Sequence, residues 1–140
     1  MRKVVVMCFL TFFGMAISSC GQEKAASVID ANGNEIKVHL IAAKPFSEGM
    51  KNQVLVDVRT PQEFKYGHIE NAVNINFFSK NWLDKYADFD KSKPIYVYCK
   101  SDNRSGSVSL KLIESGFLHV YELKNGITKW KKEGFPLVKN

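Results

Sequence analysis

The residues best suited to covalent chemistry lie in one short polar segment, Cys99 to Ser105. This segment holds a cysteine, a lysine directly after it, an arginine five residues after it and small polar residues between them. A cysteine thiolate is a strong nucleophile, and positive charge nearby favours the thiolate over the thiol. Cys99 is therefore a candidate nucleophile, with Lys100 and Arg104 as the cations that support it.

The residues on each side of this segment predict a strand and a helix. Residues 94–98 are apolar, with β-branched and aromatic side chains, which is typical of a strand buried on both faces of a parallel sheet. From Ser105 onward, apolar residues recur every three or four positions, as on a helix that packs against a sheet. Cys99 should thus lie at the carboxyl end of the strand. The free amides of the helix's first turn are expected to point at its sulfur.

An alternative interpretation is that Cys99 is an inert core thiol, since unpaired cysteines are among the most buried residue types. However, a strand end, a helix start, a guanidinium and several small polar residues together exceed what packing requires. A functional role for Cys99 is therefore favoured.

Residues 99–105 resemble the active-site loop of the rhodanese (sulfurtransferase) family, in which four residues separate a cysteine from an arginine and Ser or Thr follows. Further motifs stand in the family's order at residues 55–59, 63–64, 67–69, 72–75, 116–117, 126–130 and 134–137. The resemblance implies a single α/β rhodanese-like domain. Its central sheet would be mainly parallel, with helices on both faces and the active-site loop at the carboxyl end of a strand.

The activity that this resemblance implies is sulfur transfer without a dissociable cofactor. Cys99 would take sulfane sulfur from a small anionic donor such as thiosulfate and carry it as a persulfide. It would then pass the sulfur to a thiol or persulfide acceptor, either a small molecule or a protein. Arg104 would orient the loop and pair with the donor's negative charge, assisted by Lys100 and Ser105. The remaining residues of the substrate-binding loop are Ser101, Asp102 and Asn103.

Asp102 departs from the family pattern, because many active members carry glycine at this position. Aspartate can adopt the left-handed backbone conformation that glycine adopts freely, so the turn can be kept. Its carboxylate is nevertheless expected to weaken the use of anionic thiosulfate. A low-activity binding or redox-sensing module with the same fold is therefore the alternative function. A cysteine phosphatase is disfavoured, because the phosphatases that resemble this loop have one more residue between cysteine and arginine.

Asp57, Arg59 and His68 are interpreted as structural support. Asp57 and Arg59 close a predicted strand at residues 53–58, beside a helix start that residues 60–63 mark by their capping pattern. His68 lies in a Gly-His-Ile motif that joins this helix to the next strand in the family. The other two histidines are far away in the sequence and show no ligand spacing, so no metal site is predicted.

The first residues of the chain predict export. Arg2 and Lys3 precede an apolar run, residues 4–17, which is short for a membrane span and typical of a signal peptide at residues 1–19. The run ends in Ile-Ser-Ser-Cys-Gly, which resembles the lipobox of bacterial lipoproteins and implies lipidation of Cys20. The alternative is a plain signal peptide that is cut just before an unmodified Cys20.

These motifs predict three parts of the chain: the signal peptide, a lipid-anchored tether at residues 20–34 and the rhodanese-like domain at residues 35–140. The protein would sit in the cell envelope, anchored to a bacterial membrane and facing the periplasm or the exterior. Asn32-Gly33 between β-forming residues predicts a hairpin. The net charge of +6 falls to +4 without the two basic residues of the signal peptide. No nucleic-acid partner is predicted, because the lysines near the carboxyl end are not interleaved with aromatic residues.

Overall fold

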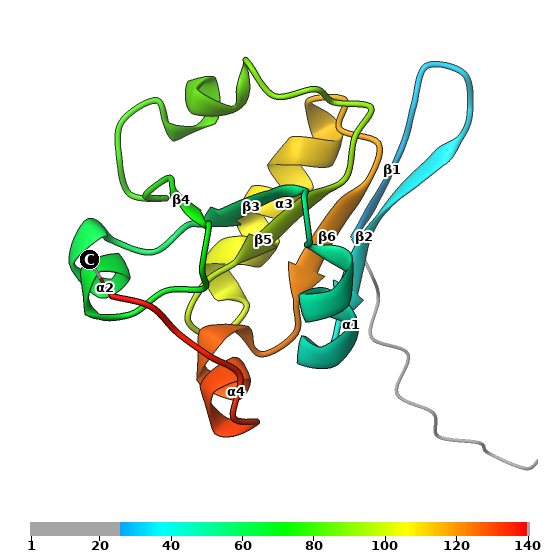
Figure 1. Cartoon of the computed structure of the whole chain (residues 1–140). Coiled ribbons are helices and arrows are strands. Elements are labelled where there is room, and N and C mark those ends of the chain that lie inside the picture. Colours follow the sequence, from blue (N-terminus) through cyan, green and yellow to red (C-terminus); the bar gives the residue numbers. More distant parts are fainter. Residues whose placement is uncertain (1–25, 140) are drawn as a thin grey trace, which may run out of the picture.

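A computed structural model describes residues 26–139 and places a six-stranded sheet at the centre of the domain (Figure 1). The strands are β1 (Ser27–Ile29), β2 (Glu35–Ile41), β3 (Val54–Asp57), β4 (Val73–Asn74), β5 (Ile95–Tyr98) and β6 (Val120–Leu123). They lie in the order β1-β2-β6-β5-β3-β4, and every neighbouring pair is parallel except β1 with β2. The predicted mainly parallel sheet is confirmed, and β5, which precedes Cys99, lies inside it.

β1 and β2 form the antiparallel hairpin predicted around Asn32 and Gly33. Gly33 has a φ of 83°, and the Asp30 carboxylate accepts a hydrogen bond of 2.8 Å from the Asn32 amide. The hairpin belongs to the sheet, so the folded part includes Ser27, which lies within the segment 20–34 predicted as a tether. Pairing with the edge of the sheet gives this hairpin backbone hydrogen bonds that a free tether lacks.

The predicted signal peptide and the predicted lipidation site at Cys20 lie outside the described residues. Within residues 26–139, no helix combines the length and the apolar character needed to cross a membrane. Export and lipid anchoring therefore stay predictions from the sequence.

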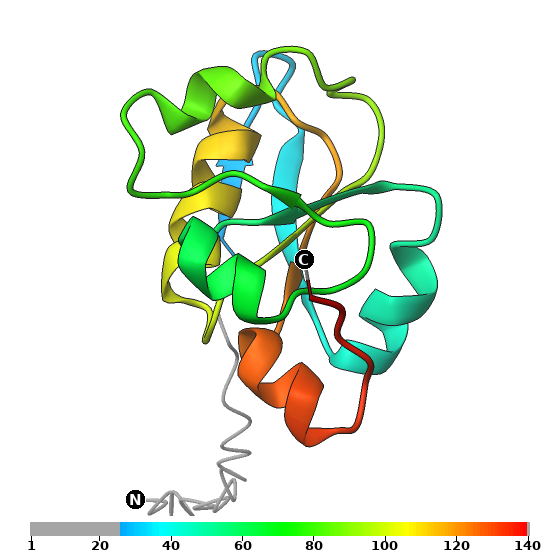
Figure 2. The same cartoon turned by 60° about the vertical axis from the view of Figure 1, so that its left-hand side comes forward.

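Helices cover both faces of the sheet, as predicted (Figures 1 and 2). On one face pack α3 (Asn103–Glu114) and the 3₁₀ helix η1 (Trp82–Tyr86), and on the other pack α1 (Ala43–Gly49) and α4 (Gly126–Lys132). The short helix α2 (Pro61–Tyr66) connects β3 to β4. The sequence also predicts a helix within residues 77–89, and η1 is that helix, shortened to one 3₁₀ segment.

The strands send alternate side chains into two cores, one on each face. In β5, Ile95 and Val97 enter the core under α3, whereas Tyr96 and Tyr98 enter the core under α1 and α4. Cys99 continues this alternation and belongs to the core under α3. Because all four residues of β5 are buried, the loop that follows starts from a rigid base.

Candidate active site

Cys99 turns its side chain beneath α3, where 1% of the residue's surface is exposed. Its sulfur lies 3.2 Å from the hydroxyl oxygen of Ser105, in the first turn of α3. The free amides of the helix's first turn are expected from the sequence to point at this sulfur, but the contact that the structure shows comes from a side-chain hydroxyl. Among the described residues the Ser105 hydroxyl is the hydrogen-bond partner of Sγ, because the alternation along β5 directs Cys99 under the helix.

A buried carboxylate, Glu122, lies on the other side of Ser105. The register of the parallel strands pairs Glu122 of β6 with Val97, so its side chain points to the same face as Cys99, two residues after Val97. Ser105 Oγ is 2.6 Å from Glu122 Oε1 and 3.1 Å from the Asp102 carbonyl oxygen. Sulfur, hydroxyl and carboxyl thus form one continuous buried chain.

The environment of Glu122 raises the pKa of its carboxyl group. Burial raises the pKa of Glu122 to about 7, the hydrogen bond from Ser105 opposes the shift, and the negative charge of Asp102 adds to it. Glu122 is 5% exposed. Glu122 is not among the site residues predicted from the sequence, although a carboxylate inside a strand that is otherwise apolar is a usable signal.

The start of α4 holds the backbone of the loop from the opposite face. The amide of Ile127 donates to the Cys99 carbonyl at 2.9 Å, and Thr128 donates to the Lys100 carbonyl through its amide at 3.2 Å and its hydroxyl at 2.9 Å. Gly126 makes this approach possible. A Cβ atom at Gly126 would lie 2.5 Å from the carbonyl group of Lys100 and 2.6 Å from the Cys99 carbonyl oxygen.

Arg104 joins α3 to α2 through Glu63. Its guanidinium donates hydrogen bonds of 2.7 and 2.9 Å to the two carboxylate oxygens and lies over the ring of Phe78. Glu63 also closes the predicted capping box with Thr60 at the start of α2. The hydrogen bonds from Arg104 lower the pKa of Glu63 to about 2.

This pair changes the expected assignment of Arg104. The resemblance implies that Arg104 orients the loop and pairs with an incoming donor, and in the structure its guanidinium forms an ion pair with Glu63. The cause is that the capping glutamate of α2 lies within reach of α3, a contact between residues 41 positions apart that sequence spacing does not reveal. Arg104 therefore fixes the position of the loop relative to α2.

The remaining loop residues face solvent, except for Asp102. Lys100, Ser101 and Asn103 are exposed. Asp102 is half-buried, and its φ of 76° is the positive φ expected where many family members carry glycine.

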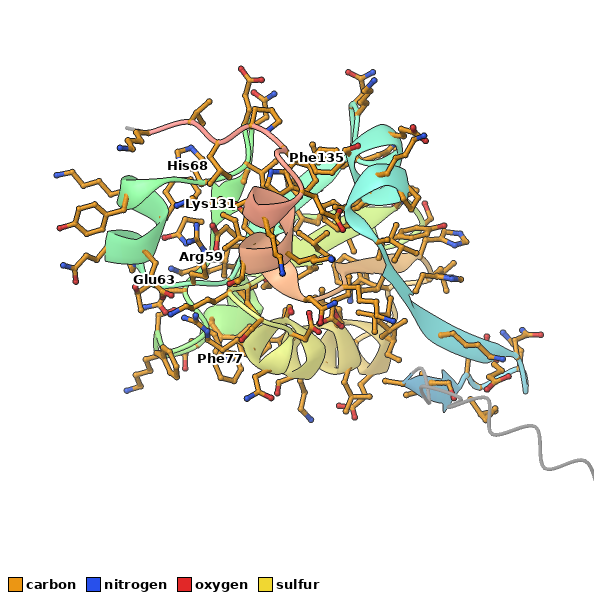
Figure 3. All side chains as sticks on the ribbon, turned by 90° about the horizontal axis from the view of Figure 1, so that it is seen from below. Arg59, Glu63, His68, Phe77, Lys131 and Phe135 are labelled. Atoms are coloured by element: carbon orange, nitrogen blue, oxygen red, sulfur yellow. The ribbon has the colours of Figure 1, made fainter. Side chains whose placement is uncertain are left out.

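A cavity of 370 Å³ adjoins the loop at Lys100. Glu63 and Tyr66 of α2 line one side of this cavity, and Thr128 and Lys131 of α4 line the other. Figure 3 looks onto this side of the domain, with Glu63 on α2 and Lys131 on α4. The exposed ammonium groups of Lys100 and Lys131 give the cavity a positive rim.

Asp57, Arg59 and His68 take positions that fit the structural role expected of them. Arg59 and Asp57 form a buried ion pair of 2.6 Å, and Arg59 also donates to the Gly67 carbonyl at 2.8 Å. His68 stacks on Phe64, with Nδ1 3.0 Å from the Phe64 carbonyl oxygen. Breaking a buried ion pair of this kind typically costs about 3–5 kcal/mol, so these contacts stabilise the turn around α2.

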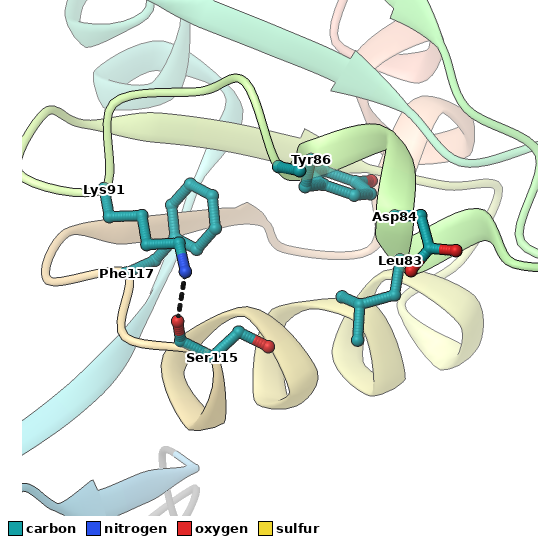
Figure 4. A pocket seen from close by; sticks show the side chains of 7 residues that line it. Leu83, Asp84, Tyr86, Lys91, Ser115 and Phe117 are labelled. Atoms are coloured by element: carbon teal, nitrogen blue, oxygen red, sulfur yellow. Dashed lines mark hydrogen bonds between the residues drawn. The ribbon is translucent and has the colours of Figure 1, made fainter.

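A second cavity, of 170 Å³, lies away from the loop (Figure 4). It is lined by residues of η1 and by Ser115 and Phe117, beyond the carboxyl end of α3, and Lys91 closes it with a hydrogen bond of 2.8 Å to the Ser115 carbonyl. Cys99 lies under the opposite end of that helix, so this cavity is separate from the candidate site.

Among residues 26–139, no three metal-ligating side chains come together.

Fold and site together define a class of protein: an α/β domain with a buried cysteine at the carboxyl end of a central parallel strand. The sequence profile of the Rhodanese-like domain matches residues 42–133. The chain belongs to the rhodanese family.

Similar proteins include some that are named for sulfur transfer. The chain is 38% identical over 79 residues to the thiosulfate sulfurtransferase GlpE of Coxiella burnetii, which covers 56% of this chain and 71% of that protein. A rhodanese-related protein of Thermoplasma volcanium is similar in structure, with a TM-score of 0.65, 30% identity, and coverage of 73% of this chain and 99% of that one. The polysulfide-sulfur transferase of Wolinella succinogenes has a TM-score of 0.62, 26% identity, and coverage of 74% and 80%.

Proposed function

We propose that this protein is a sulfurtransferase that carries sulfane sulfur as a persulfide on Cys99. The observation that supports the proposal most directly is the contact of the Cys99 sulfur with a buried hydroxyl at the carboxyl end of β5. Relatives that are named thiosulfate sulfurtransferase and polysulfide-sulfur transferase support sulfur transfer as the reaction.

In the first proposed step, the Cys99 thiolate attacks the sulfane sulfur of thiosulfate. A sulfur–sulfur bond forms on Cys99, the bond within thiosulfate breaks, and its electron pair leaves on sulfite. In the second step, an acceptor thiolate attacks the outer sulfur of the persulfide. The electron pair of the broken bond then returns to Sγ and restores the thiolate.

The chain's own residues would position these reactants. The rim of the cavity beside the loop carries Lys100 and Lys131, whose charges attract a small anionic donor and an anionic acceptor. The Arg104–Glu63 pair and the hydrogen bonds from α4 would hold the backbone of the loop in place during the reaction.

We also propose that the protein acts at the cell envelope of a bacterium. The signal-like residues 1–19 and the lipobox-like sequence that ends in Cys20 support this proposal. Cys20 would carry the lipid that attaches the domain to a membrane, facing the periplasm or the exterior.

Mass spectrometry of the full chain after incubation with thiosulfate or polysulfide tests the reaction. We expect the peptide that contains Cys99 to gain one sulfur atom, and we expect Cys99→Ser to gain none and to transfer none, with an unchanged circular dichroism spectrum. The matched control is Ser107→Ala, which removes an exposed hydroxyl from α3, the helix that covers Cys99. This variant should behave as wild type. Equal sulfur transfer by wild type and Cys99→Ser would reject the mechanism. A wild type that gains no sulfur from either donor would instead favour a binding or redox-sensing module.

A further inference from the structure

A buried hydrogen-bond chain joins Cys99, Ser105 and Glu122. A nucleophile and an anion site alone would not require the buried carboxyl group at the end of this chain. All three residues are at most 5% exposed, and the contacts are 3.2 Å from sulfur to hydroxyl and 2.6 Å from hydroxyl to carboxyl. A lone carboxyl group in this position is costly to bury unless its hydrogen bonds are satisfied. The hydroxyl of Ser105 can donate toward one end of the chain and accept from the other.

We propose that Glu122 is a positioning residue that holds the proton displaced from Cys99 whenever the sulfur becomes anionic. This inference rests on the proposed function and assigns a role within it to a residue outside the loop. The proton passes through the hydroxyl of Ser105, so Glu122 does not itself touch a substrate.

The two protonation states of the chain have opposite hydrogen-bond directions. In the first state, the Cys99 thiol donates to Ser105 Oγ and the Ser105 hydroxyl donates to the Glu122 carboxylate. In the second state, the protonated Glu122 donates to Ser105 Oγ and the Ser105 hydroxyl donates to the sulfur anion. One S–H bond and one O–H bond of Ser105 break, and two O–H bonds form. The three side chains of Cys99, Ser105 and Glu122 together carry one negative charge in both states.

The proton balance of the proposed reaction follows from this exchange. A thiol and a Glu122 carboxylate, together with thiosulfate, become a persulfide anion and a protonated Glu122, together with sulfite. No proton has to leave the buried site, and no second buried charge forms. That matters because a carboxylate beside an anionic sulfur in a site shielded from water would repel it strongly.

The pKa of Glu122, raised to about 7 mainly by burial, places this exchange in the neutral range. Three groups affect the charge of Glu122: Ser105 of α3 by a hydrogen bond, Asp102 of the preceding loop by its charge, and Cys99 through Ser105. On β2, the residue paired with Glu122 is the apolar Leu40. Asp102 is negative and adds to the upward shift. Below neutral pH, the protonated Glu122 supports an anionic sulfur. Above neutral pH, the ionised Glu122 opposes it and draws the Ser105 hydroxyl away.

The decisive comparison is between wild type and Glu122→Gln in reaction with methyl methanethiosulfonate, a small neutral reagent that transfers a methylthio group to thiolates. The rate of modification is followed by mass spectrometry on the peptide that contains Cys99 of the full chain, from about pH 5 to pH 9. Gln can donate to Ser105 as a protonated Glu does, but it never ionises. We expect equal rates below about pH 6, and an advantage for Glu122→Gln that grows to about tenfold by pH 8.5 as repulsion sets in.

Two further variants separate this role from a structural one. Glu114→Gln, which removes an exposed carboxylate from α3, should follow wild type at every pH. Ser105→Ala should slow modification most below pH 7, where the hydroxyl donates to the sulfur, so it tests the proposal even if Glu122→Gln fails to fold. A rate ratio between variant and wild type that does not change with pH, for both Glu122→Gln and Ser105→Ala, would overturn the inference.

This readout involves no sulfur donor, so it is independent of the reaction proposed above. If the expected pH dependence is found but no donor loads Cys99, the proposed function fails while the proton exchange at the thiol holds. If Cys99 is loaded but the rate ratios stay constant with pH, the inference about Glu122 fails alone.

Discussion

At the scale of single residues, the candidate site combines the proposed nucleophile, Cys99, with a carboxyl group whose charged form is penalised by burial. Cys99 and Ser105 could be buried at little cost, but an ionised Glu122 could not, because burial penalises its charged form. A carboxyl group kept in such a place, hydrogen-bonded to the hydroxyl that contacts the nucleophile, is more typical of a functional site than of packing.

This cost predicts how stability depends on pH. The folded protein holds a proton on Glu122 up to about pH 7, whereas in the unfolded chain the group titrates near its ordinary value of 4.5. Because the folded state then binds the extra proton, the contribution of Glu122 to stability is lost as pH rises from about 4.5 to about 7. The upper bound of the loss is about 3 kcal/mol.

Urea unfolding of wild type and Glu122→Gln at about pH 5 and pH 8 measures this effect. We expect the stability advantage of Glu122→Gln over wild type to be larger at the higher pH by up to about 3 kcal/mol, since glutamine stays neutral. Glu114→Gln should show no such growth. An advantage of the same size at both pH values would mean that Glu122 titrates normally in the folded protein.

At the scale of elements, the first turn of α4 binds the backbone of the loop directly. Ile127 and Thr128 bind the carbonyl groups of Cys99 and Lys100, and this approach requires a residue without a side chain at Gly126. Gly126 also has a φ of 56°, which ordinary residues adopt at a cost of roughly 1–2 kcal/mol.

Gly126→Ala should therefore abolish most sulfur transfer, because its Cβ atom would push the Cys99–Lys100 backbone out of place. Gly134→Ala is a matched control: Gly134 also has a positive φ, of 81°, but a Cβ atom there meets nothing within 4 Å. We expect Gly134→Ala to lose about 1 kcal/mol of stability and little activity. Rates of sulfur transfer and urea midpoints of both variants separate an effect on activity from an effect on stability. Equal activity losses in the two variants would refute the positioning role of Gly126.

The sequence predicted the local features of the site better than its contacts. β5, the start of α3, the capping box of α2 and the hairpin at Gly33 follow from short-range patterns of apolar, capping and turn residues. The Arg104–Glu63 pair and the contact of Ser105 with Glu122 join residues 41 and 17 positions apart. Such contacts depend on how strands are ordered in the sheet, and apolar periodicity does not specify that order.

At the scale of the whole molecule, the proposed lipid anchor at Cys20 lies close in the sequence to the start of the folded domain. The described domain starts its sheet at Ser27, which leaves few residues between the sheet and Cys20. A lipid on Cys20 would therefore hold the domain close to the membrane surface.

We expect wild type, expressed in a bacterium with a lipoprotein pathway, to fractionate with membranes and to carry added lipid mass at Cys20. Cys20→Ala should move to the soluble fraction and keep sulfur transfer by the purified protein. Cys8→Ala, which leaves the lipobox-like sequence intact, is the control and should stay with membranes. Wild type without lipid mass in the soluble fraction would show that the anchor was wrongly predicted.

The attachment of the loop to both faces of the sheet has a consequence for heat inactivation. The Cys99 side chain belongs to the core under α3, while the carbonyl group of the same residue is bound by α4 on the opposite face. Melting of α3 or of α4 alone would displace the sulfur, so a partly unfolded form that has lost either helix would not retain the site. Thermal loss of activity and global unfolding should then be one cooperative event, with a single midpoint.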